Sequence, residues 1–394
     1  MSELKVNSIK GTGASTAAIT IDSSSGGCTA NITNNLSNRN ILINGAMQVA
    51  QRGTSSTTNG MGSVDRYYIG YNAVDEAPTQ AQADISAGTT PYTLGFRKSL
   101  KITNGNQTSG AGAADYIFIN MAQEAQNLAT SGWNYKSSSS YVTLSFWIKS
   151  SVAQNFYFQF DVRDGTRYNY TMETGSLTAN TWTKITKVIP GNSNLTIDND
   201  NGVGAFITFG LFWGTDYTSS VSLETWGAAN DSAKTPNNTS TWYTTNDSTL
   251  EFTGFQLEVG SVATDFEHRS YAQELQLCKR YYYQETRYGS TGGNGAGVFA
   301  LAMTANSSNG SIYANMNHPV EMRSAPTLSF SGTFAAHRFG VSIHQITAAN
   351  MVGGYHNSTT ATTIAGTNSG ATPGQGTLAF LEGVSGTIMF SAEL

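Results

Sequence analysis

Acidic residues are the first candidates for chemistry in this sequence, and they fall into two groups. Asp161, Asp164 and Glu173 lie within one stretch, and Glu251 and Glu258 lie within another. Hydrolysis of a glycosidic bond needs two carboxyl groups about 5 to 9 Å apart on either side of a sugar. Asp161 and Glu251 alternate with apolar neighbours, so we expect their side chains on the solvated face of a sheet. Nothing in the spacing places two of these carboxyls opposite each other, and we therefore expect no catalytic residues.

Metal-ligating residue types are scattered along the chain. The histidines form neither an HExxH motif nor an i, i+4 pair; they are His268, His318, His337, His344 and His356. Cys28 and Cys278 stand far apart, which favours neither a disulfide framework nor a metal site. The run Asp-Asn-Asp-Asn-Gly that begins at Asp198 resembles the start of an EF-hand loop, but Phe209 replaces the closing Glu. We expect an Asx-rich turn, with calcium at Asp198 and Asp200 as the alternative and no other metal or cofactor.

Aromatic residues in polar, loop-like contexts are the remaining candidates. An indole or phenol ring there can stack on the apolar face of a sugar, while Asn, Asp and Arg side chains bond to its hydroxyls. The residues of this kind are Trp133, Tyr135, Trp226, Trp242 and Tyr243, whereas Trp147 and Trp182 alternate within strand-like runs. Each ring could instead anchor a loop under the edge of the fold. We take Trp226, Trp242 and Tyr243 as candidate sugar contacts.

The composition favours strands joined by tight turns. Charged residues make up 12 % of the 394 residues, against the usual quarter, while hydrophobic residues reach 39 % and Gly occurs 41 times. Ser, Thr and Asn replace the missing charge, and Thr, Val, Ile and aromatic residues prefer strands, so we expect an all-β fold. The net charge is −5 without a long basic run, which argues against nucleic acid as a partner.

Residues 38–268 are predicted to form one β-sandwich. Apolar and polar residues alternate in successive runs that Gly, Asn and Asp interrupt, as is typical of a sandwich or jelly roll. The runs are 41–45, 64–69, 100–102, 116–119, 141–149, 155–162, 182–188, 206–212 and 250–257.

A helix is predicted in the short neck that follows, residues 269–284. Ser270 is a plausible N-cap, and the stretch to Tyr283 contains neither Gly nor Pro. One-sided spacing marks a seam of Tyr271, Leu275, Cys278 and Tyr282. The seam fits either packing on the chain's own sandwich or a parallel three-helix neck.

The two ends of the chain lead to different structural predictions. Residues 1–37 contain too few apolar residues to fold alone, so we expect them to fold on a partner or within an oligomer. Residues 285–394 are predicted to form a second β domain, with a long loop at Ser358–Gly376. Its expected strands are 297–303, 311–316, 327–330, 340–346 and 387–391. The N-terminus, Met1–Asn7, lacks the features of a secretory signal, and we expect no Sec export.

Several of these strings resemble tail-fibre (receptor-binding) proteins of marine podoviruses such as cyanophages and pelagiphages. The similar stretches are 4–9, 40–53, 143–150, 198–202, 255–269, 278–282 and 319–327. The most specific is the run from Phe255 to Arg269, which continues into Cys278-Lys279-Arg280-Tyr281-Tyr282. The resemblance covers most of residues 1–330 and becomes weaker toward the C-terminus.

The resemblance implies a homotrimeric fibre of the virion, made in the host cytoplasm. Residues 1–37 would anchor it to a tail nozzle or adaptor protein, and residues 38–268 would form a jelly roll similar to carbohydrate-binding modules. The implied function is attachment to a host-surface glycan or outer-membrane receptor; the alternative is a tail spike with glycoside hydrolase activity. Because such fibres expose their distal end, residues 285–394 are expected to form a receptor-binding tip.

Receptor contacts are expected first in that tip, because loops carry recognition without disturbing the sheets beneath them. The candidates there are His337, Arg338, Tyr355 and His356, with the Ser358–Gly376 loop. Trp226, Trp242 and Tyr243 of the middle domain are ranked second.

Overall fold

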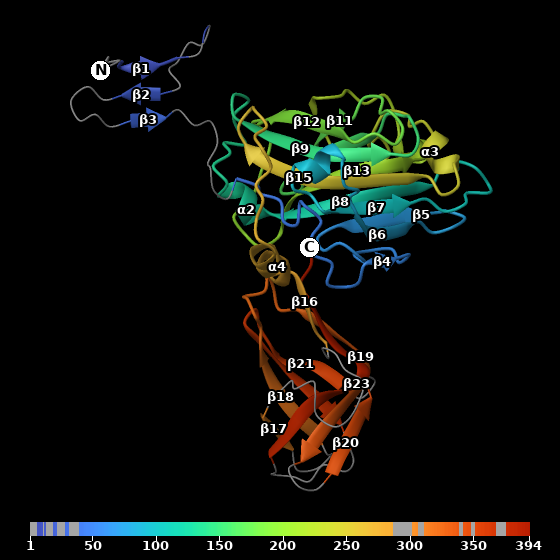
Figure 1. Ribbon diagram of the computed structural model, residues 1–394, viewed down its shortest axis with the longest axis vertical. Helices are drawn as coiled ribbons and strands as arrows, with labels where there is room; N and C mark the ends of the chain where they lie inside the picture. Colours follow the sequence, from blue (N-terminus) through green and yellow to red (C-terminus); the bar gives the residue numbers. More distant parts are fainter. Residues whose placement is uncertain are drawn as a thin grey trace.

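The computed structural model describes residues 6–10, 12, 19–21, 28–30, 39–286, 302–305, 311–338, 342–347, 351–367 and 376–394. The strands in these ranges pair antiparallel and form four sheets, which confirms the all-β prediction. Figure 1 shows a small N-terminal sheet, a large sandwich and a C-terminal β domain that extends away from it. No helix among the described residues is long and apolar enough to cross a membrane.

The N-terminal sheet is very small. It consists of β1 (Ser8–Ile9), β2 (Ile19–Ile21) and β3 (Cys28–Ala30), with β2 in the middle. In Figure 1 it stands apart from the sandwich. Ile9 lies on its surface, more than half exposed. That the segment folds on a partner stays a prediction.

The sandwich consists of two six-stranded sheets. The first sheet has the order β14 (Trp226–Ala228), β11 (Tyr168–Glu173), β10 (Tyr157–Val162), β13 (Val203–Trp213), β8 (Tyr116–Glu124) and β5 (Tyr68–Asn72). The second has the order β12 (Thr183–Pro190), β9 (Tyr141–Ser150), β15 (Thr249–Val259), β7 (Lys98–Thr103), β6 (Thr79–Asp84) and β4 (Ser55–Ser56). Short helices lie in the connections: α1 (Thr90–Thr93), α2 (Ala125–Ala129), the 3-10 helix η1 (Thr215–Tyr217) and α3 (Thr241–Thr244). The chain passes repeatedly between the two sheets, as in a jelly roll.

Phenylalanine rings fill the space between the sheets. Phe158 and Phe209 of the first sheet stack at 5.4 Å, and Phe146 and Phe255 of the second stack at 4.7 Å. Phe146 also meets Phe158 edge to face at 5.4 Å, which joins the two layers. Burying each ring contributes about 1.5 to 3 kcal/mol, so this alternation of inward Phe with outward polar residues is what holds the sandwich together.

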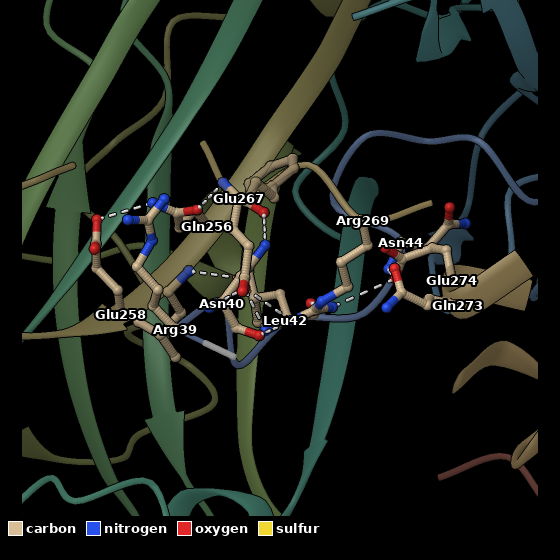
Figure 2. Close-up of polar contacts among 12 residues, drawn as sticks. Arg39, Asn40, Leu42, Asn44, Gln256, Glu258, Glu267, Arg269, Gln273 and Glu274 are labelled. Carbon is tan, nitrogen blue, oxygen red and sulfur yellow. Dashed lines mark hydrogen bonds and ion pairs between the residues drawn. The ribbon is translucent and has the colours of Figure 1, made fainter. Parts of the chain in front are cut away.

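Residues 41–45 differ from the prediction, because they form bends and a turn rather than a strand. The backbone still bonds to β15 at two points, from the Ile41 N–H to the Leu257 carbonyl at 2.9 Å and from the Phe255 N–H to the Gly45 carbonyl at 3.0 Å. Side chains supply further bonds: the Asn40 Oδ1 accepts from the N–H groups of Leu42 at 3.0 Å and Leu257 at 3.1 Å. Arg269 donates to the carbonyls of Asn40 and Leu42, and Glu274 accepts from the Asn44 N–H. Figure 2 shows this segment held between β15 and the chain around Arg269 and Glu274.

The neck contains helix α4 (Tyr271–Lys279), shorter than predicted. Ser270 is the N-cap and forms a capping box with Gln273. Residues after Lys279 leave the helix, and Tyr282 begins strand β16 (Tyr282–Thr286). The predicted seam is therefore not one open face, because Cys278 and Tyr282 are buried within the chain while Tyr271 is 56 % exposed.

In the part of the chain that the structure describes, the C-terminal domain is one eight-stranded sheet. Its elements after β16 are β17 (Ala302–Ala305), β18 (Ser311–Asn317), β19 (Thr327–Arg338), β20 (Ser342–Thr347), β21 (Met351–Asn357), β22 (Ala361–Thr367) and β23 (Gly376–Ser391). This sheet folds over on itself, since a Cβ on Gly353 of β21 would meet Leu328 of β19. The predicted loop at Ser358–Gly376 is wrong in its first half, where β22 pairs with β18.

Charged residues join the sandwich to the C-terminal domain. Glu124, at the end of β8, accepts from Arg280 Nε at 2.8 Å and Nη2 at 3.0 Å, and Arg66 pairs with Glu393. Arg323 donates through Nε to the Ala392 carbonyl at 2.6 Å and through Nη1 to the Asn201 carbonyl at 2.9 Å. The last residues therefore return to the sandwich beside α4 (Figure 1), and the neck is a bonded joint.

Candidate functional site

Two of the predicted sugar contacts are inside the protein. Trp242 and Tyr243, on α3, are 0 % and 1 % exposed. Tyr243 stacks on Phe212 at 4.2 Å and donates its hydroxyl hydrogen to Asp115 at 2.9 Å. Burial first, and Asp115 second, raise the pKa of Tyr243. Both residues are core anchors, so the prediction that they contact a sugar is wrong.

The other loop-like aromatics anchor the sandwich edge. Trp226 lies in β14, packs against Tyr170 with ring centroids 5.2 Å apart, and donates its Nε1 hydrogen to the Pro190 carbonyl at 2.7 Å. Trp133 is buried, and the half-buried Tyr135 donates to the Ile197 carbonyl at 3.2 Å. These residues tie loops to strands, which is the alternative that the sequence left open.

The C-terminal candidates lie on strands rather than loops, and they are separated. His337 and Arg338 end β19, where they pair with Ile343 and Ser342 of β20. Tyr355 and the exposed His356 belong to β21, whose last residue, Asn357, bonds to the Pro326 carbonyl beside the start of β19. At about 3.3 Å per residue, the length of β19 separates the two pairs by about 35 Å. The side chains of His337, Arg338 and Tyr355 lie outside the described residues.

The structure has a turn at the position of the calcium alternative. The Asp200 Oδ1 accepts from the Gly202 N–H at 2.8 Å, and the Asp198 N–H donates to Asp164 at 2.9 Å. Burial raises the pKa of Asp164, and the nearby Asp198 and Asp200 raise it further. Among the described residues, no group of three or more His, Cys, Asp and Glu is arranged to hold a metal ion.

The two carboxylates expected on solvated sheet faces point outward, but they are buried and on different sheets. Asp161 of β10, in the first sheet, is 5 % exposed and accepts from Arg163 at 2.8 Å and Arg167 at 2.9 Å. Glu251 of β15, in the second sheet, pairs with Lys149 at 2.8 Å. Because these side chains lie on opposite outer faces of the sandwich, they cannot flank one glycosidic bond.

The outer face of the first sheet carries a surface that the sequence analysis missed. Along β8, Ile117 and Ile119 point into the core while Tyr116 and Phe118 point outward. Together with neighbours on β5, β13 and η1 they form the aromatic face, defined here as Tyr68, Tyr116, Phe118, Trp213 and Tyr217. Neighbouring ring centroids on it lie 5.3 to 6.1 Å apart. Tyr68, at one end, is 38 % exposed.

Glycines allow these rings to lie against the sheet. Phe118 stands opposite Gly70 of β5 on one side and opposite Gly210 of β13 on the other. A Cβ on Gly70 would overlap the Phe118 ring, and a Cβ on Gly210 would overlap the Trp213 indole. Phe118 is nearly parallel to Trp213, at 14°, and to Tyr68, at 22°. The three rings therefore lie in one row across neighbouring strands, with Tyr68 exposed at one end and Trp213 only 5 % exposed at the other.

A polar cluster lies on the same face, farther along β10 and β11. It consists of Asp161, Arg163, Arg167 and Asn169, with Asp161 directly opposite Asn169. The Oδ2 atom of Asp161 accepts hydrogen bonds from both arginines. No described residue bonds to the buried Asp161 Oδ1, Asn169 Oδ1 or Arg167 Nε. Leaving a buried donor or acceptor unpaired costs about 1 to 3 kcal/mol. Two acceptors and one donor are thus unpaired, and because these atoms are buried a ligand reaches them only when a neighbouring side chain moves.

The strand register connects the aromatic face to the polar cluster. Thr208 of β13 and Asn120 of β8 face each other between them, with Thr208 Oγ1 and Asn120 Oδ1 3.4 Å apart. Asp161 and Phe118 are separated by two strand spacings across the sheet and by four residues along β13. The straight-line distance between them is therefore about 16 Å. A chain of sugars, rather than a single ring, fits that length.

The segment around Lys234 forms one side of this surface. The Lys234 carbonyl accepts a hydrogen bond from Gln159 at 2.6 Å. The Lys234 ammonium lies 2.5 Å from Asp231 and 5.6 Å from the centroid of the Trp213 ring. The hydrogen bond from Lys234, opposed by burial and supported by Arg167, lowers the pKa of Asp231 to about 2. Asp231 therefore remains charged at neutral pH and holds both Lys234 and Arg167 in place.

A separate groove of about 910 Å³ lies beside α4. It is lined by residues 39–43, the end of α2, and residues 267–277. Its floor includes Asn40, Glu267 and Arg269, which Figure 2 shows bonded within the protein. These side chains hold the segment 39–44 in place.

No protein-family model and no curated protein matches the chain. Among solved structures, a CBM4 module aligns over 55 % of this chain and 97 % of its own, with 13 % identity and a TM-score of 0.28. A putative sugar binding protein from Bacteroides thetaiotaomicron aligns over 56 % of this chain and 99 % of its own, with 10 % identity and a TM-score of 0.30. Tailspike protein 4 of bacteriophage CBA120 aligns over 56 % of this chain but 21 % of its own, with 11 % identity and a TM-score of 0.30. At these identities and TM-scores the likenesses carry no argument about function.

Proposed function

We propose that this protein is a non-catalytic, glycan-binding attachment protein, the tail fibre of a bacteriophage. The observation that carries the proposal is the outer face of the first sheet, where an aromatic strip lies beside unpaired polar atoms. The family resemblance of the sequence supplies the biological setting, in which the fibre holds the virion to a host-surface glycan.

Sugar recognition needs the two kinds of surface that this face combines. The apolar side of a pyranose stacks on aromatic rings, and here Tyr68 and Phe118 offer neighbouring rings on adjacent strands. Sugar hydroxyls both donate and accept, and Asp161 Oδ1, Asn169 Oδ1 and Arg167 Nε supply complementary partners. A ligand that bonds to these atoms removes their desolvation penalty, so specificity is expected at this end.

The binding test uses the full-length protein and oligosaccharides prepared from host-surface polysaccharide. Tyr68→Ala should weaken binding about 5- to 10-fold, the equivalent of 1 to 1.5 kcal/mol for one aromatic contact. Asn169→Leu removes an acceptor without breaking the Asp161 ion pairs, and it should weaken binding while leaving the free energy of unfolding unchanged or higher.

Tyr271→Ala is the matched control, because Tyr271 is an exposed tyrosine on α4, away from this face. Equal affinity in the wild type and both face variants would contradict the proposed site. Release of reducing sugar ends from the polysaccharide would show that the protein is a hydrolase. We expect no release, since Asp161 and Glu251 lie on opposite faces.

A further inference from the structure

The outer face of the second sheet carries tryptophans and lysines that the proposed function does not use. On β9, Trp147 and Lys149 point outward while Phe146 and Ile148 enter the core. Lys184 of β12 stands opposite Trp147, and Glu251 of β15 stands between Lys149 and Lys101 of β7. Trp182 immediately precedes β12. We call Trp147, Trp182, Lys101, Lys149 and Lys184 the basic face.

Glu251 fixes one of these lysines against an indole. Its Oε1 lies 2.8 Å from the Lys149 Nζ, and its Oε2 accepts from the Ser99 hydroxyl at 3.1 Å. The same Lys149 Nζ lies 5.1 Å from the centroid of the Trp182 ring. Because Glu251 is 8 % exposed, it acts as a buried support, and the ammonium and the indole form the accessible surface.

Trp147 is held by apolar packing on its other side. It packs, together with Trp182, against a small cluster that includes Phe96. Gly254 has a φ of +68°, and a Cβ there would crowd both Phe96 and Trp147. The half-buried indole is therefore fixed in orientation before any ligand arrives, which lowers the entropy cost of binding.

The charge of this face is opposite in sign to the net charge of the chain. Lys149 and Lys101 stand on either side of the buried Glu251, and Lys184 stands opposite Trp147, in a protein whose net charge is −5. Lysine on an edge strand commonly protects a sheet against edge-to-edge aggregation, and this role is enough to explain Lys184 on β12. It does not explain Lys149 and Lys101, which lie on the interior strands β9 and β7.

We propose that the basic face binds an acidic glycan. A sugar ring stacks on the indole of Trp182, and its carboxylate meets Lys149 and Lys184. The patch is too short and contains too few cations to neutralise a nucleic-acid backbone, which takes a long basic stripe. This site is independent of the aromatic face on the first sheet, so either can fail without the other.

Oligogalacturonate and its methyl ester are the probes, since they share one backbone and differ in carboxylate charge. The wild type should bind the acidic form and lose affinity as salt rises, because exposed charges are screened. Lys184→Gln should weaken binding about 3- to 10-fold at unchanged thermal stability. Trp182→Ala should weaken binding about 10-fold and also lower the thermal stability, because Trp182 packs on the cluster that includes Phe96. Trp182→Phe should retain most of the affinity.

Matched controls separate this site from general charge effects and from the first sheet. Lys136→Gln changes another exposed lysine, in a loop, and should bind like the wild type, as should Tyr68→Ala. Equal binding of the methyl ester, or equal losses in Lys136→Gln, would overturn the proposal. So would equal affinity for single-stranded oligothymidylate, which would reveal a general polyanion surface.

Discussion

At the residue scale, Gly70 is what allows the Phe118 ring to lie against the sheet. Gly70 and Gly227 both lie in strands of the first sheet, but their surroundings differ. A Cβ on Gly70 would overlap the Phe118 ring, whereas a Cβ on Gly227 would meet nothing within 4 Å. Close contact with a ring, rather than backbone freedom, therefore explains the glycine at position 70.

We predict that Gly70→Ala destabilises the protein and tilts Phe118 away from Tyr68. Inserting a methyl group into an occupied site costs about 1 to 3 kcal/mol, and the displaced ring should also weaken glycan binding. Gly227→Ala is the control and should leave both properties unchanged. Urea unfolding and glycan titration measure the two effects. A Gly70→Ala protein with wild-type stability would show that Phe118 does not lie over this glycine.

Sequence reasoning found the aromatic residues of the first sheet but not their role. Tyr116 and Phe118 were assigned to a strand from their alternation with Ile117 and Ile119, and that strand is present as part of β8. Which residues stand beside them depends on β5 and β13, far away in the chain. A glycine that stands opposite an outward aromatic residue was the available signal, but using it requires the strand register.

At the element scale, the neck shows which features a local sequence pattern can predict and which it cannot. Ser270 was correctly predicted as an N-cap, because capping depends on neighbours three residues away. The helix was predicted to continue to Tyr283, yet Tyr282 and Tyr283 pair with Ser391 and Phe390 of β23. Local sequence cannot show a partner at the other end of the chain, and aromatic residues fit a strand well once that partner is there.

We predict that the Glu124–Arg280 pair makes the joint sensitive to acid. Burial raises the pKa of Glu124, but hydrogen bonds from Arg280, Tyr281 and Gln126 outweigh burial and hold it below its ordinary value. A carboxyl whose pKa is lowered by folding stabilises the protein above its unfolded pKa, and this stabilisation is lost as the pH falls through the folded pKa. The Glu124 contribution should therefore begin to fall below the unfolded pKa of about 4.3 and be lost once the pH is below the lower, folded pKa.

The measurement is urea unfolding of Glu124→Gln between pH 7 and pH 3. The variant should lose about 2 kcal/mol at pH 7, because it leaves Arg280 partly buried without a charged partner. It should also show a flatter pH profile than the wild type. Asp65 and Glu274 act with the opposite sign, since burial raises both of their pKa values. Equal slopes in wild type and variant would exclude Glu124 as the acid-sensitive group.

At the scale of the whole molecule, we predict a parallel homotrimer that docks on a tail nozzle or adaptor protein through residues 1–37. The N-terminal sheet has two or three residues in each strand, too few to form a core alone, so neighbouring copies or the tail should complete it. Deletion of residues 1–37 should leave a soluble trimer by light scattering that blocks phage adsorption but does not enter virions. A monomer mass for the full-length chain, or incorporation of the truncated one, would contradict this assignment.

The last prediction concerns which domain determines host range. The sequence favoured residues 285–394, because the distal end of a fibre meets the host first. The structure gives reasons to favour residues 38–268, since β19 keeps His337 and Arg338 far from His356, whereas the aromatic face and the polar cluster share one sheet. Exchanging residues 285–394 with those of a relative of different host range should therefore leave adsorption unchanged. The exchange must preserve Arg323 and Glu393, because both bond across the joint to the sandwich. A chimera that adsorbs to the donor's host instead would place the receptor contacts in the C-terminal sheet.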